Sequence, residues 1–176
     1  MTIIGQDRPG LVDSVAAIVA EQGGNWLESR MSRLGGHFAG ILRVEVPAEQ
    51  EAILVQSLKG LSAKGLSVVV HPDQPPSLSG ERKLSILEIV GQDRPGIVRE
   101  ISHALAEYGV NVEELHTERA SAAMSGEMLF RAKAHLSIPE NCSLVEIRRK
   151  LEQIAEDLIV EVSLEELPAQ RSEAVR

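Results

Sequence analysis

The chain has 176 residues, 43% hydrophobic and 2% aromatic, with a formal net charge of −8 at pH 7. That charge argues against nucleic-acid binding by the chain itself, because phosphate contacts need a concentrated basic face, and so few aromatic side chains make no base-stacking platform. A single cysteine excludes an internal disulfide framework. No apolar run reaches the ~20 residues of a membrane span, and the N-terminus lacks signal-peptide features. We therefore expect a soluble, cytoplasmic protein.

One hexapeptide occurs twice. Residues 5–10 read GQDRPG, and residues 91–96 repeat them letter for letter, 86 positions later (91 − 5). Comparing residues 5–28 with 91–114 at this offset gives twelve identities in twenty-four positions, whereas average composition predicts about one or two. A repeat near half the chain length predicts two copies of one domain.

The first copy predicts a strand–helix–hairpin–helix–strand order from its apolar periodicity. Its elements are a strand ending at residues 2–4, a helix marked by Leu11, Val15, Ile18 and Val19 and ended by Gly23 and Gly24, a hairpin of residues 26–33 and 38–46 around a turn at 34–37, a helix marked by Leu54, Leu58 and Leu61, and a strand at 67–70. Gly40, inside a strand, predicts a bulge or a close backbone approach.

The second copy repeats this order. Its elements are a strand at 84–90, a helix marked by Ile97, Ile101, Leu105 and Tyr108 and ended by Gly109, a hairpin of 110–122 and 128–138 with its turn around 124–126, a helix marked by Leu144, Ile147, Leu151, Ile154 and Leu158, and a strand at 159–164. The first copy's opening strand is about three residues shorter, so either it is truncated or the chain starts upstream. Pro47 and Pro139 close the two hairpins and stand 92 positions apart (139 − 47), so the second hairpin is six residues longer (92 − 86). We expect the extra residues at its exposed tip.

These orders define an α+β fold class. Each copy is a ferredoxin-like β-α-β-β-α-β unit, an antiparallel sheet with both helices on one face. We expect the first domain at residues 1–71, a Pro/Ser/Gly linker at 72–83, the second domain at 84–166 and a disordered tail at 167–176.

The hexapeptide is the one stretch with a binding rationale. It joins the first strand to the first helix, so we expect Asp7 and Asp93 at the N-caps with the prolines in the first turn. Unpaired N–H groups there attract a carboxylate, Gly10 and Gly96 leave the backbone accessible, and the aspartate can receive an ammonium group. Arg8 or Arg94 would pair with a carboxylate. The alternative is that the turn is only a well-capped helix start.

The remaining polar residues predict no catalytic site. Asn25 and Asn111 follow the helix-ending glycines, where asparagine is favoured because it tolerates a left-handed backbone. The five histidines show no ligand spacing with Cys142 or with acidic pairs, so we infer no metal. No nucleophile motif, phosphate loop or dinucleotide fingerprint is present, and we expect neither a cofactor nor an enzymatic activity.

The Asp-Arg-Pro-Gly-(Leu/Ile)-Val turn, the element order and the Gly-x-Asn after the first helix together resemble the ACT domain, a small-molecule-binding module of amino-acid metabolism. Two copies in tandem over residues 1–166 resemble the glycine cleavage system transcriptional repressor family. Supporting stretches are residues 25–31 and 125–130. The resemblance implies that the modules pair edge to edge into an eight-stranded sheet and that the protein dimerises.

The resemblance also implies a function. The protein would respond to glycine or another small amino acid and regulate transcription by binding an activator protein, with no direct nucleic-acid or membrane contact. By position-matching, the ligand contacts would be Gln6, Asp7, Arg8, Pro9, Gly10, Leu11, Val12, Asn25, Gln92, Asp93, Arg94, Pro95, Gly96, Ile97, Val98 and Asn111.

Two other functions stay open at this point. The chain can be a structural interaction module whose sites bind no ligand, although two intact hexapeptides count against that. It can also be the sensory piece of an enzyme, because similar turns open formyltetrahydrofolate deformylases and phosphoserine phosphatases. No catalytic domain follows the second copy, so we expect the enzyme alternative to fail.

Overall fold

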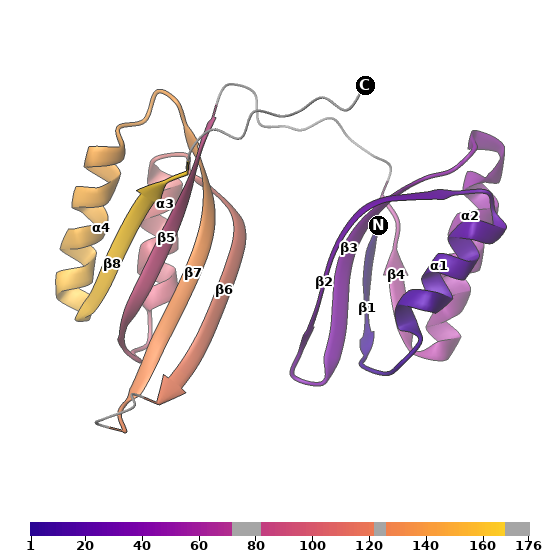
Figure 1. Cartoon of the computed structure of the whole chain (residues 1–176), viewed down its shortest axis with the longest axis horizontal. Helices are drawn as coiled ribbons and strands as arrows, with labels where there is room; N and C mark the ends of the chain where they lie inside the picture. The colour runs from indigo at the N-terminus through magenta and orange to yellow at the C-terminus, as the bar shows by residue number, and fades with distance from the viewer. Residues whose placement is uncertain (72–81, 122–125, 168–176) are drawn as a thin grey trace. The chain divides into compact units, whose positions relative to one another are not determined.

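The computed structural model describes residues 1–71, 82–121 and 126–167 (Figure 1). The chain divides into two compact units, Met1–Pro75 and Pro76–Arg176. We call residues 1–71 the first module and the described residues from 82 onward the second module. The predicted linker and tail lie largely outside the described residues, as does most of the predicted turn at 124–126.

The first module has the predicted element order. It comprises β1 (Thr2–Gln6), α1 (Leu11–Glu21), β2 (Asn25–Leu34), β3 (His37–Glu45), a 3-10 turn η1 (Ala48–Gln50), α2 (Glu51–Gly60), a second 3-10 turn η2 (Leu61–Lys64) and β4 (Leu66–Val69). Its antiparallel sheet has the strand order β2-β3-β1-β4. Both helices cover one face of that sheet (Figure 1).

The second module repeats the arrangement. It comprises β5 (Arg82–Gln92), α3 (Ile97–Glu107), β6 (Asn111–Ser121), β7 (Met128–Pro139), α4 (Leu144–Leu158) and β8 (Val160–Glu166). Its strand order is β6-β7-β5-β8, again antiparallel throughout. The α+β class and the two ferredoxin-like units are therefore confirmed. Each sheet has four strands, and their pairing into eight strands stays a prediction.

Each module has its own aliphatic core between sheet and helices. In the first module it includes Ile3, Val15, Leu42 and Leu58, all 0–1% exposed. In the second it includes Leu87, Leu136, Ile147 and Leu151, also 0–1% exposed. The residues that recur at helical spacing are buried in these cores or half-buried against them, which is why that spacing identified the helices correctly.

The register of the two hairpins shows where the copies diverge. Leu34 pairs with His37 in the first hairpin, and Ala120 pairs with Leu129 in the second. Two residues therefore separate the first pair and eight separate the second (129 − 120 − 1), which places all six extra residues at the tip, as predicted. Both edge strands also carry a bulge at the same place, between Trp26 and Glu28 and between Val112 and Glu114.

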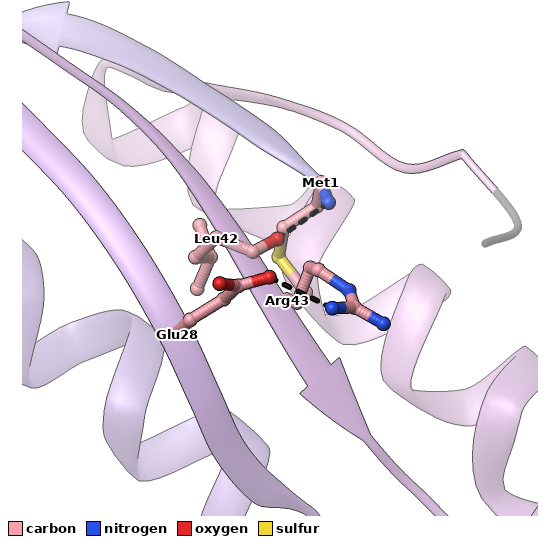
Figure 2. Close-up of polar contacts among 4 residues, drawn as sticks. All are labelled: Met1, Glu28, Leu42 and Arg43. Atoms are coloured by element: carbon pink, nitrogen blue, oxygen red, sulfur yellow. Dashed lines mark hydrogen bonds and ion pairs between the residues drawn. The ribbon is translucent and has the colours of Figure 1, made fainter. Parts of the chain in front are cut away.

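Strand β3 is contacted by the first residue of the chain on one side and by β2 on the other (Figure 2). The Met1 ammonium group donates a hydrogen bond to the Leu42 carbonyl oxygen (2.7 Å), and the Leu42 N–H donates to the Met1 carbonyl oxygen (2.9 Å). On the other side, Arg43 Nη1 lies 2.8 Å from Glu28 Oε1 across the β2–β3 pair. The equivalent pair in the second module is His135 Nδ1 with Glu114 Oε2, at 3.6 Å.

Three details of the sequence interpretation are wrong. Asp7 and Asp93 are not N-caps, because the N-cap residues of α1 and α3 are Gly10 and Gly96. The asparagines after the helices are not left-handed, since Gly23 and Gly109 take that conformation instead. The last strand does not begin at Ile159, which is the left-handed C-cap of α4. Gly40 makes a close approach without a bulge, since a Cβ there would lie 2.5 Å from Met31 Cγ.

Candidate functional site

The hexapeptide turn leaves the start of the following helix without a side-chain cap. Gly10 (φ 87°, ψ 5°) precedes α1, and Gly96 (φ 98°, ψ −12°) precedes α3. The prolines before them disfavour a helical conformation at Arg8 and Arg94, and the glycines then supply the left-handed residue that aims the chain into the helix. Because neither glycine offers a side-chain cap, the N–H groups of the first helical turn face outward as donors.

Each hexapeptide aspartate contacts the neighbouring hairpin. The Asp7 N–H donates to the Gly36 carbonyl oxygen (2.9 Å), and the Asp93 N–H donates to the Met128 carbonyl oxygen (3.2 Å). The turn and the hairpin end are thereby held together in both modules. Figure 1 shows that the turn and the hairpin end lie at the same end of each sheet, where β1 or β5 leads into the helix.

The same hairpins place an arginine on each aspartate. Arg33 Nε lies 3.2 Å from Asp7 Oδ2, and Arg119 Nε lies 2.6 Å from Asp93 Oδ2. The arginine side chains are 71% and 63% exposed, whereas the aspartates are 31% and 28% exposed. Each turn therefore presents an anchored carboxylate and a solvent-facing guanidinium group side by side.

Sequence reasoning missed these two arginines. Arg33 and Arg119 stand 86 positions apart (119 − 33), the same offset as the hexapeptides. Extending the comparison of the two copies beyond residue 28 would have found the match. What the sequence does not give is the bulge in each edge strand, which shifts the register before the arginine and sets which residues lie opposite it.

The hexapeptide arginines differ between the modules. Arg8 Nη2 donates to the Lys64 carbonyl oxygen (2.8 Å), so it fastens the turn to the end of η2. Arg94 Nη2 instead donates to the Gln92 side-chain oxygen (3.1 Å) within its own turn. Arg8 therefore has a partner elsewhere in its module, while the hydrogen bond of Arg94 among the described residues goes to an exposed neutral side chain in its own turn.

The other predicted ligand residues divide by exposure. Leu11 and Ile97 are 3% and 2% exposed, so only their backbone can meet a ligand. Val12 and Val98, one position later, are 44% and 45% exposed. Gln6 and Gln92 are the last residues of β1 and β5, and Pro9 and Pro95 lie in the turn.

A single module does not bring the predicted asparagines to the turn. Asn25 begins β2, eight residues before Arg33, which corresponds to roughly 26 Å along an extended strand. Asn111 begins β6 in the same way, and its side-chain amide donates to Glu113 Oε1 (2.7 Å). Within its own module, each asparagine therefore belongs to the opposite end of the sheet from the turn.

Other chemistry is limited in the part of the chain that the structure describes. No group of three or more histidine, cysteine, aspartate or glutamate side chains there has the arrangement of a metal site. Cys142 Sγ donates to the Tyr108 carbonyl oxygen at 3.1 Å. No helix in residues 1–71, 82–121 and 126–167 has the length and apolar character needed to cross a membrane.

Comparison with known proteins identifies the family. The ACT domain matches residues 1–71 and again residues 85–137. The chain therefore belongs to the ACT-domain family and carries two copies of the domain. A search of curated protein sequences found no match to it.

Solved structures with both modules are also similar. An unidentified protein from Galdieria sulphuraria has 28% identity and a TM-score of 0.84, with 95% of this chain and 96% of that chain covered. A protein proposed to be a glycine cleavage system transcriptional repressor has 18% identity and a TM-score of 0.70, with 96% and 95% covered. At that identity the second similarity concerns the fold.

Proposed function

We propose that this protein is an amino-acid-responsive regulator that binds its ligand at the hexapeptide turns. The observation that carries the proposal is the arrangement around Asp93, repeated around Asp7. In each case an aspartate–arginine pair lies beside a helix N-terminus that has no side-chain cap. A zwitterionic amino acid carries the two opposite charges that this surface complements.

The second module illustrates the binding mode. The ligand's ammonium group would approach the Asp93 carboxylate, while its carboxylate would accept hydrogen bonds from the first N–H groups of α3. The positive end of the helix dipole favours an anion at that point. Arg119, whose Nε is held by Asp93, would direct its remaining guanidinium N–H groups toward the same carboxylate.

The regulatory output would act through protein contacts. We propose a transcriptional regulator of glycine cleavage that responds to glycine or a related small amino acid, binds a transcription activator and forms a homodimer in the cytoplasm. The tandem fold shared with the proposed repressor supports this assignment, and the net charge of −8 argues against direct binding to DNA. We propose a binding role rather than an enzymatic one.

A structural interaction module is the second candidate. The outward face of the first sheet carries Ile4, Ile41 and Val69, which are 51%, 64% and 49% exposed and lie on β1, β3 and β4. Exposed aliphatic side chains on neighbouring strands are typical of a protein contact. On this alternative, the aspartate–arginine pairs would only close the turn.

Isothermal titration of the purified protein with glycine, serine and a panel of other amino acids separates these functions. Gly10→Val and Gly96→Val should abolish binding, because the new side chains occupy open space beside the helix N-termini. Gly23→Val and Gly109→Val are the matched controls, since they share the positive φ but stand at the other ends of the helices. Binding lost equally in the controls, or by no variant, would contradict the assignment of the turn. Binding of no amino acid by the wild type would favour the interaction module.

A further inference from the structure

The last strand of the second module has an open edge. β8 pairs with β5 on one side, and no strand of the described structure pairs with it on the other. Successive residues of an antiparallel strand direct their backbone groups toward opposite sides. Leu167, just after β8, donates its N–H to the Leu84 carbonyl oxygen (2.8 Å), so the odd-numbered residues of β8 turn their backbone toward β5. The even-numbered residues Val160, Val162 and Leu164 turn theirs toward the open edge.

One end of this edge already has a hydrogen-bond partner. Arg148 Nη2 on α4 donates to the Leu164 carbonyl oxygen (2.7 Å), as expected for a residue that faces away from β5. Val160 and Val162, nearer the start of the strand, have no hydrogen bond across the edge to any described residue. A sheet edge with unpaired N–H and C=O groups can accept an additional strand.

An acidic groove lies along this unpaired part of the edge. α4 runs beside β8 (Figure 1), and the groove there has a volume of about 820 Å³. Val160 and Val162 line it together with three carboxylates, those of Glu152 and Glu156 on α4 and of Glu161 on β8. The other residues that line it are apolar. The groove therefore combines unpaired backbone groups with negative charge, and it favours a cationic partner in an extended conformation.

The spacing of the carboxylates matches that of an extended chain. Glu152 and Glu156 are one helical turn apart, which is about 6 Å along α4, and side chains on one face of a strand recur about every 6.5 Å. Basic residues at every second position of an added strand would therefore meet both glutamates. The side chains between them would point to the opposite face, where Val90, Leu129 and Glu161 line the groove. Aliphatic residues suit those positions.

We propose that the open edge of β8 binds an extended segment of a partner protein in which basic and aliphatic residues alternate. The segment adds a strand to the second sheet. Its backbone pairs with Val160 and Val162, and its basic side chains pair with Glu152 and Glu156. The inference rests on the protein-contact output of the proposed function and gives that output a surface, but it requires no ligand at the hexapeptide turns.

The same observations disfavour other occupants and the other module. A second copy of β8 would place like charges on neighbouring strands, which is destabilising. In the first module, β4 has only four residues, and the turns before it carry Lys59 and Lys64. The last turn of α4 carries no basic residue. The preference for a basic segment is therefore a property of the second module.

Fluorescence anisotropy with labelled, end-capped heptapeptides and the full chain tests the proposal. The probe TKVKVKT alternates lysine and valine, and KKKVVTT has the same composition and charge without the alternation. The charge-reversed probe is TEVEVET. We expect the wild type to bind TKVKVKT about five-fold or more tightly than KKKVVTT, because only the alternating peptide can pair with the edge and place lysines opposite both glutamates.

Two kinds of variant separate the charges from the strand pairing. Glu152→Lys combined with Glu156→Lys should weaken binding of TKVKVKT about ten-fold or more and create binding of TEVEVET, since two attractions become repulsions. Val162→Pro should weaken it roughly five- to ten-fold, because it removes an edge N–H that does not bond to β5. The matched control is Glu107→Lys with Glu146→Lys, which reverses two exposed carboxylates outside the groove. We expect it to change binding less than two-fold.

Each other outcome overturns the inference. Equal binding of TKVKVKT and KKKVVTT, or an equal loss in the control, would mean that only net charge is recognised. No binding of TKVKVKT by the wild type would mean that the glutamates only protect the edge from pairing. The charge-reversed variant and TEVEVET decide the question even if Val162→Pro does not fold. Titration of amino acids is a separate measurement, so the groove can fail while the turn site stands, and the reverse.

Discussion

Ile159 takes the left-handed backbone conformation that Gly65 takes at the equivalent position of the first module. Its φ and ψ are 56° and 51°, and those of Gly65 are 77° and 14°. The equivalence follows from the sheets, since Leu66 pairs with Gly5 as Val160 pairs with Gly91. A left-handed isoleucine is strained because its branched side chain crowds the backbone. The two modules therefore place residues of very different conformational energy at the same left-handed backbone position.

Replacing Ile159 by glycine should stabilise the second module. Relief of the left-handed strain is worth about 1–2 kcal/mol, and the extra flexibility of glycine in the unfolded chain costs about 0.5–1 kcal/mol. The Ile159 side chain is 59% exposed, so little buried contact is lost. We expect a net gain of about 0.5–1 kcal/mol in the free energy of unfolding, measured by urea denaturation.

The reciprocal control is Gly65→Ala. A Cβ at Gly65 meets no atom within 4 Å, so its cost comes from the positive φ alone. We expect a loss of about 1 kcal/mol in the first module. An unchanged or lower stability of Ile159→Gly would show that contacts of the isoleucine outweigh its backbone strain.

The two glycines of each hexapeptide should respond differently to substitution. A Cβ at Gly91 would lie 2.6 Å from the Val160 Cα, and one at Gly5 would lie 2.5 Å from the Gly65 carbonyl oxygen. Both neighbours are backbone atoms, so the strands must separate, and we expect Gly5→Ala and Gly91→Ala each to cost about 2–3 kcal/mol. Urea denaturation of these variants beside Gly10→Ala checks the contrast, because the Cβ at Gly10 faces open space and only its φ of +87° carries a cost, about 1 kcal/mol. Equal losses at the three positions would refute it.

Ser85 should tolerate loss of its hydroxyl group. Its side chain is fully buried, and its oxygen has no hydrogen-bond partner in the described structure. An unsatisfied buried hydroxyl costs about 1–3 kcal/mol, so Ser85→Ala should leave the stability unchanged or raise it by up to about 1 kcal/mol. The control is Ser137→Ala, since Ser137 is also buried but its Oγ accepts a hydrogen bond from Arg82 Nε (2.7 Å).

Thermal and urea unfolding compare these two serine variants. We expect Ser137→Ala to lose about 1.5–3 kcal/mol, because a charged donor would then be left without one acceptor. A loss in Ser85→Ala comparable to that of Ser137→Ala would mean that the Ser85 hydroxyl has a partner, such as an ordered water molecule.

The elements and their order were predictable from the sequence because burial imposes a period on each of them. Leu144 to Leu158 recur at helical spacing, and α4 has these bounds. The hexapeptide repeat likewise fixed the two-module organisation. These signals are local, because the residue types along each helix or strand agree with the structure that the segment takes in the fold.

The errors arose where the tertiary arrangement decided the backbone. An aspartate before Arg-Pro-Gly is typical of a helix cap, but Asp7 and Asp93 instead pair with arginines of the adjacent hairpins. Ile159 reads as the start of a β-branched strand, yet the connection from α4 to β8 requires a left-handed residue there. The equivalence of Ala134 with Leu42 was also beyond sequence reasoning, because the offset between the copies changes within the hairpin and only the strand register establishes it.

Arg119 should contribute to ligand binding far more than to stability. Its side chain is 63% exposed, so its ion pair with Asp93 is worth at most about 1 kcal/mol to folding. A charge-assisted hydrogen bond to a ligand carboxylate is worth about 1.5–3 kcal/mol, and we therefore expect Arg119→Gln to weaken amino-acid binding roughly ten- to hundred-fold. Calorimetric titration measures the affinity, and urea denaturation the stability. Lys133→Gln is the control, because Lys133 is 52% exposed and pairs with Glu88 between β7 and β5. Undiminished affinity in Arg119→Gln would mean that the guanidinium group serves only to hold Asp93 against the hairpin.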